Sequence, residues 1–125
     1  MRFEARDLKP YAEPVVADDL REGEVYFSVH FVDEEMLIPI VGTWVYAGKM
    51  FDAEISEDRL IFQDVVSYGH GIRYGTDEES EGEFQLEQQK YVNHIFEYER
   101  ALEVLMNCSL RRSKQRITKG PTSVQ

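Results

Sequence analysis

The three histidines are the side chains best suited to acid–base chemistry. His30 lies in a segment of alternating apolar and polar residues, and His70 lies in a glycine-rich stretch shortly after Asp64. A histidine oriented by a carboxylate is a common general acid or base in enzymes. His30, His70 and Asp64 are therefore the set expected of a small enzyme, which requires the fold to bring them into one cavity.

His94 and Glu97 are the pair whose spacing suits a metal ion. In a helical segment, residues three apart lie one turn apart on the same surface. Only His30, His70 and Cys108 remain as further nitrogen or sulfur ligands, and the order His-x-x-Glu differs from the His-Glu-x-x-His of zinc peptidases. The sequence predicts no metal and no other cofactor, with a mononuclear site at His94 and Glu97 as the alternative.

Two loops come close to known binding motifs without matching them. Residues 69–75 space their glycines as G-x-G-x-x-x-G, one residue too long for a dinucleotide-binding turn, and an acidic segment follows instead of a helix. A calcium loop counted from Asp77 in that acidic segment, residues 76–83, would have Gln88 at position twelve, where a bidentate Glu is needed. We expect both to be exposed loops.

Aromatic side chains gather on strand positions that a one-sided sheet would fill with polar residues. Tyr and Trp combine a large apolar area with a polar tip, as anchors of interfaces often do. The predicted binding set is Tyr26, His30, Trp44, Tyr46, Tyr68 and Tyr74. This face is either a platform for a ligand or partner, or a surface covered by the N-terminal arm and residues 65–74.

Alternation of apolar and polar residues predicts several short strands. They lie at residues 24–32, 36–41, 43–47, 59–63 and 84–87. The short polar connection at residues 33–35 favours an antiparallel hairpin, in which Pro39 marks an edge or a bend. Gly48 is expected to end its strand.

One long helix is predicted at residues 91–112, because apolar residues recur there at spacings of four and three. These residues are Tyr91, Ile95, Tyr98, Leu102 and Leu105. The helix is expected to pack on the sheet face that carries Val25, Phe27, Val29 and Phe31. The fold class is therefore α+β, a curved antiparallel sheet or small open (SH3-like) barrel of four to five strands with a long C-terminal helix packed on it.

Length and composition favour one domain at residues 1–112 of the 125, beginning with an extended arm over residues 1–23 and a short strand at 2–6. A basic, flexible tail is expected at residues 113–125. The single cysteine excludes an intrachain disulfide, and no apolar stretch suits a signal peptide or a membrane span, so a cytoplasmic protein is expected.

Fourteen Lys and Arg stand against twenty-four Asp and Glu, which gives a formal charge of −10. An acidic body repels phosphate backbones, so broad nucleic-acid binding is disfavoured. Because no catalytic motif is complete, we expect a non-catalytic binding or assembly module that uses the aromatic face or an exposed sheet edge, with a protein partner or self-association. The small enzyme described above is the alternative.

Overall fold

A computed structural model describes residues 13–119 of the chain, with side chains described through residue 115. The strands are β1 (Val25–Phe31), β2 (Pro39–Asp52), β3 (Glu57–Asp64), β4 (Phe84–Gln88) and β5 (Ile95–Phe96). The helices are α1 (Val65–Gly69) and α2 (Tyr98–Lys119), and three single 3-10 turns are η1 (Ala17–Asp19), η2 (Glu79–Glu81) and η3 (Gln89–Tyr91).

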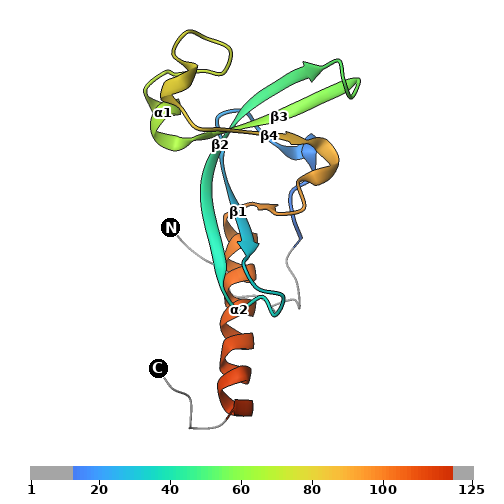
Figure 1. Cartoon of the computed structure of the whole chain (residues 1–125), viewed down its shortest axis with the longest axis vertical. Helices are drawn as coiled ribbons and strands as arrows, with labels where there is room; N and C mark the ends of the chain where they lie inside the picture. The colour runs from blue at the N-terminus through green and yellow to red at the C-terminus, as the bar shows by residue number, and fades with distance from the viewer. Residues whose placement is uncertain (1–12, 120–125) are drawn as a thin grey trace.

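The five strands form one open antiparallel sheet in the order β4-β3-β2-β1-β5 (Figure 1). The predicted α+β class, with an antiparallel sheet and a long C-terminal helix, is confirmed. The predicted strand at residues 2–6 lies outside the described residues. The helix α2 runs through Lys119, so the first part of the expected tail is helical.

Strand β2 is longer than predicted. Gly48 does not end it, because the register against β3 shifts between Tyr46 and Gly48, and the strand continues to Asp52. Gly48 has a φ of +116°, a backbone conformation that L side chains rarely adopt, so glycine lets the chain bulge without breaking the strand.

The two halves of β2 have different neighbours. Residues from Pro39 to Val45 pair with β1, whereas pairing with β3 begins only at Trp44 and continues to Asp52. Figure 1 shows the first half of β2 beside β1 and the second half beside β3. Among the described strands, the first half of β2 therefore has a neighbour on one side only.

The helix begins at Tyr98, so the predicted start at residue 91 is wrong. Tyr91 ends the 3-10 turn η3, and Ile95 lies in β5, which pairs with Phe27 and Ser28 of β1. The helical spacing of Tyr91 and Ile95 does not reflect a shared buried face, because the sheet buries Ile95 and Val92 whereas Tyr91 is 53% exposed. Pairing with β1 outweighs the helical preference of this short segment.

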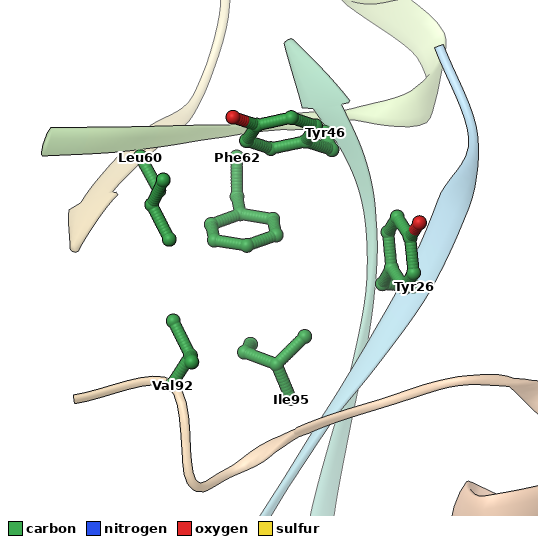
Figure 2. Close-up of a cluster of buried hydrophobic side chains, with 6 residues drawn as sticks. All are labelled: Tyr26, Tyr46, Leu60, Phe62, Val92 and Ile95. Atoms are coloured by element: carbon green, nitrogen blue, oxygen red, sulfur yellow. The ribbon is translucent and has the colours of Figure 1, made fainter. Parts of the chain in front are cut away.

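Each face of the sheet carries a core. On one face, α2 packs on β1 as predicted, in a cluster formed by Val29, Phe96 and Ala101 with Phe27, Phe31, Val104 and Leu105 around it. On the other face, Figure 2 shows Leu60 and Phe62 directed from β3 toward Val92 and Ile95. Complete burial of a side chain such as Phe62 contributes about 1.5–3 kcal/mol.

Candidate functional site

A hollow of about 460 Å³ lies on the sheet face opposite α2. Strand pairing places its floor, because Ser28 of β1 lies opposite Gly42 of β2, and His30 lies opposite Ile40. The remaining walls come from β3, β4 and the segment before β5. The lining residues are Ser28, His30, Ile40, Gly42, Trp44, Phe62, Gln85, Glu87, His94 and Ile95.

Two imidazole rings meet at one wall of the hollow. The rings of His30 and His94 have their centroids 4.7 Å apart, with 31° between their planes. The backbone holds His94 in place, because Val29 donates its N–H to the His94 carbonyl at 3.0 Å. The Nε2 atom of His94 lies 3.7 Å from a carboxylate oxygen of Glu87. Residues distant in sequence thus converge on one wall.

The surroundings of His94 favour its neutral form. Burial lowers the pKa of His94 below its usual value of 6.5, and nearby His30 lowers it further. The carboxylate of Glu87 and a backbone hydrogen bond at Tyr91 act in the opposite direction without overcoming burial. His94 is therefore mainly neutral at pH 7 and does not supply a positive charge beside Glu87.

Trp44 forms part of the hollow by bonding across a glycine. Its indole Nε1 donates a hydrogen bond to Ser28 Oγ at 3.0 Å. A Cβ at Gly42 would lie 2.6 Å from the Trp44 Nε1 and 2.7 Å from the Ser28 Oγ. The missing side chain at Gly42 is thus what lets the indole lie over β2.

The other predicted aromatic residues do not join this hollow. Tyr26 and Tyr46 are only 6% and 4% exposed and belong to the core in Figure 2. Val15, Ala17 and Leu20 of the N-terminal segment pack against that core, as predicted for the arm. The cluster contains Val92 and Ile95 in place of any residue of the predicted cover at 65–74.

Tyr68 lies in α1 and Tyr74 in the loop that follows it, and neither lines the hollow. The guanidinium of Arg73 sits 3.8 Å above the centre of the Tyr68 ring. Tyr74 contacts Phe84 edge to face, with ring centroids 5.4 Å apart. Both tyrosines support the connection between α1 and β4 rather than a shared platform with Trp44.

The structure does not gather the predicted catalytic set in the hollow, since of its members only His30 lines that cavity. Asp64 is the N-cap of α1, where it accepts hydrogen bonds from the Ser67 N–H at 2.9 Å and the Glu83 N–H at 2.8 Å. The Ser67 hydroxyl also donates to Asp64, and these bonds lower the pKa of Asp64. His70 is exposed at the C-cap of α1.

The geometry assumed for the metal alternative is wrong. His94 precedes β5 and Glu97 follows it, so the two residues do not share a helical turn. Instead, Glu97 borders a separate groove of about 740 Å³ with Asp18, Asp19 and other residues. Within residues 13–119, no three His, Cys, Asp or Glu side chains are placed to hold a metal ion. Cys108 is buried, and its thiol donates to the Leu37 carbonyl at 3.5 Å.

Sequence reasoning missed Gln85 and Glu87 as members of the site. Alternation within the predicted strand at residues 84–87 does place the two on one face. Nothing local shows that this face meets His94, because β4 and β1 are separated by two other strands in the sheet.

The first half of β2 is a second notable surface, which we call the free edge and define as Pro39–Thr43. On the side away from β1, no strand of the described residues pairs with it. Ile40 and Val41 are 54% and 46% exposed, on opposite faces of the strand. An uncovered strand edge presents backbone groups that can pair with another strand.

In the described part of the chain, no helix is both long enough and apolar enough to span a membrane. The structure therefore offers a hollow and a free edge as its two candidate sites. Comparisons with protein-family models, with curated proteins and with solved structures found no match for this chain.

Proposed function

We propose that this chain is a non-catalytic, cytoplasmic assembly module that pairs with a second copy of itself through the free edge of β2. The observation that supports this proposal is that β3 pairs with β2 only from Trp44 onward, so that within residues 13–119 no second strand pairs with Pro39–Thr43. The aromatic face is a weaker basis for assembly, because Tyr26 and Tyr46 are buried in the core.

The direction of the backbone groups follows from the pairing with β1. Tyr46 donates its N–H to the Glu24 carbonyl at 3.0 Å, and its own carbonyl accepts from the Gly23 N–H at 2.8 Å, so Tyr46 faces β1. Backbone groups alternate along a strand. The groups of Val41, the N–H of Thr43 and the carbonyl of Pro39 therefore point away from β1.

Pro39 fits this edge without weakening the sheet. Proline has no N–H, and at this position the missing group would have pointed away from β1. The β1–β2 ladder consequently loses no hydrogen bond, in agreement with the expectation that Pro39 marks an edge. A strand that pairs with the free edge would use only the carbonyl of Pro39, as a hydrogen-bond acceptor.

An antiparallel copy of the same edge is complementary to it. A two-fold axis at Val41 pairs the Val41 N–H of each copy with the Val41 carbonyl of the other. The same register brings the Thr43 N–H of one copy to the Pro39 carbonyl of the second copy. Each outward donor meets an acceptor, and the absent N–H of Pro39 leaves no donor unpaired.

The side chains of the free edge also favour pairing with another strand, because they lack the features that usually prevent association. Natural edge strands usually carry lysines or inward-pointing charges that prevent association. Residues 36–47 contain no charged side chain. In the antiparallel register, Ile40 of each copy lies opposite Gly42 of the other, and the two Val41 side chains lie on the face that carries Val29. The edge is thus uncharged and largely apolar, and no strand in the described part of the chain pairs with it.

Val41→Pro tests the proposal, because it removes the outward N–H and leaves the bonds to β1 intact. Sedimentation velocity over a range of concentrations should show a weak, reversible dimer of the wild type, with a Kd on the order of 0.1 mM for so short a contact. Val41→Pro should be monomeric, whereas Val41→Thr, which keeps the N–H and the β-branched shape, should dimerise like the wild type.

A second pair of variants covers the case in which Val41→Pro unfolds. Val41→Lys should be monomeric with an unchanged circular dichroism spectrum, and Val66→Lys, which places the same charge on an exposed valine of α1, should still dimerise. In the wild type, amide exchange at Val41 and Thr43 should slow as protein concentration rises. A wild type that stays monomeric at millimolar concentration, or a dimer that survives Val41→Pro and Val41→Lys, overturns self-association through this edge.

A further inference from the structure

We propose that the hollow lined by Trp44, His30, His94 and Glu87 is a binding site for a small organic cation, an ammonium that carries alkyl groups. This inference stands apart from the assembly proposed above, since it concerns a side-chain cavity and not the backbone of the free edge. It rests on the charge of the lining, the kind of surface around that charge, and the size of the cavity.

The charge of the lining selects a cation. Among the described residues that line the hollow, Glu87 is the only carboxylate, and none is a Lys or Arg. The nearest ionisable groups to Glu87 in the site are His94, at 3.7 Å, and beyond it His30. A formal charge of −10 on the whole chain adds a long-range attraction for cations.

The surface around Glu87 suits an alkylated cation better than a metal ion. Trp44, Phe62, Ile40 and Ile95 supply aromatic and aliphatic walls. A cation placed over an indole ring gains about 0.5–2 kcal/mol, depending on how far it is desolvated, and recognition of quaternary ammonium ligands by aromatic side chains is a general use of this attraction. A metal ion would need three convergent ligands, which the described residues do not supply.

The hydrogen bond between Trp44 and Ser28 orients the indole for this role. Its Nε1 proton is already committed to Ser28 Oγ at 3.0 Å, so the indole has no donor left to offer a ligand. What remains toward the hollow is the ring itself. The polar end of Trp44 is thus held beside Gly42 by its hydrogen bond to Ser28, while the rest of the side chain lines the cavity.

The size of the hollow agrees with a small ligand. Its volume of about 460 Å³ falls within the range of small-molecule sites, roughly 300–1,000 Å³. The larger groove beside Glu97 is a different kind of surface, lined by Asp18, Asp19 and Glu24 with Arg21 among them. That groove lacks a Trp and serves as the internal comparison in the experiment.

The single tryptophan makes the site directly observable. We would titrate the full chain with choline and follow tryptophan emission and the NMR shift of the Trp44 indole N–H. The matched probe is 3,3-dimethylbutan-1-ol, which has the shape of choline without its charge. Choline should give a saturable change in both signals, and the neutral alcohol should be about tenfold weaker or inactive, which corresponds to 1.4 kcal/mol or more.

Variants then assign the charge. Glu87→Gln should weaken choline binding about tenfold or more. Glu97→Gln removes the same charge from the neighbouring groove and should leave the response of Trp44 unchanged. Lowering the pH below 6.5, through the lowered pKa of His94, should also weaken binding, because protonation of His94, which faces His30 and Glu87, places a competing positive charge in the hollow.

A further probe identifies the source of the cation. Nα-acetyl-lysine amide presents an alkylammonium as a basic peptide would, and choline presents it as a free metabolite would. Saturable binding of choline or of Nα-acetyl-lysine amide that is lost in Glu87→Gln and kept in Glu97→Gln supports the proposal. The probe that binds more tightly indicates whether the natural cation is a free metabolite or part of a basic peptide. Equal responses to choline and the neutral alcohol, no saturable response to choline or the lysine derivative, or binding unaffected by Glu87→Gln overturns it.

Discussion

Replacing Gly42 by alanine tests the packing at the centre of the hollow. The new methyl group would lie 2.6 Å from Trp44 Nε1 and 2.7 Å from Ser28 Oγ, closer than real Cβ atoms approach other heavy atoms. The indole must therefore move and lose its 3.0 Å bond to Ser28. Gly42 does not have a positive φ, so alanine adds no backbone strain of its own.

The expected cost combines three contributions. Overpacking costs about 1–3 kcal/mol, and loss of the hydrogen bond costs about 0.5–1.5 kcal/mol. Alanine reduces the freedom of the unfolded chain relative to glycine, which returns about 0.4–1 kcal/mol. The free energy of unfolding of Gly42→Ala should therefore fall by about 2 kcal/mol, which lowers Tm by about 8 °C for a chain of this size.

Urea unfolding followed by the fluorescence of Trp44 measures this change, and the emission of the folded variant should shift as well. Gly69→Ala is the matched control, because a Cβ there meets no heavy atom within 4 Å and Gly69 ends α1, where alanine is favoured. The double variant Gly42→Ala/Trp44→Leu should recover part of the loss. A Gly42→Ala protein as stable as Gly69→Ala, with unchanged emission, would refute the placement of the indole over Gly42.

Three further perturbations have expected outcomes. Asp64→Ala should lower the free energy of unfolding by about 1–2 kcal/mol through loss of the α1 cap. Because the pKa of Asp64 is lowered below 3.8, the stability that ionised Asp64 contributes to the wild type should be complete above pH 3.8 and disappear as pH falls through the folded pKa. Urea melts at pH 7 and pH 3 would detect this loss. The pKa of His94 is lowered, so its NMR titration midpoint should lie below 6.5, and its contribution to stability should be lost as pH falls from 6.5 toward that midpoint. Added salt should tighten the dimer measured by sedimentation, because it screens the repulsion between two chains of charge −10; a dimer that weakens with salt would indicate charge-driven association.

Strand alternation predicted much of the sheet because its signal is local. Val25 to Phe31 alternate between two faces, and the structure confirms both the strand and the side on which α2 packs. The start of the helix was not predictable in this way. The spacing of Tyr91 and Ile95 satisfies a helix, but the hydrogen bonds of β5 to β1 decide the conformation, and those bonds join segments about sixty-seven residues apart.

The residues of the candidate site likewise fall into those that local sequence patterns identify and those that only contacts between distant segments identify. His30 and Trp44 were identified from sequence because aromatic and titratable side chains on a strand face are visible in the alternation. Glu87 and Gln85 were not, and His94 was assigned to the wrong neighbour, Glu97, because its partner is set by where β5 returns to the sheet. The same reasoning could not separate Tyr26 and Tyr46 from Trp44, since burial depends on what covers the face.

The sequence by itself determined the α+β class, the main strands, the acidic surface and the absence of charge from residues 36–47, because these depend on residue type and on short-range periodicity. Only the tertiary structure decided where β3 leaves β2, which aromatic side chains are buried, and that His94 lies beside His30 and Glu87. These features depend on pairing between distant segments, whose free energy comes from backbone hydrogen bonds and apolar burial that no local pattern records.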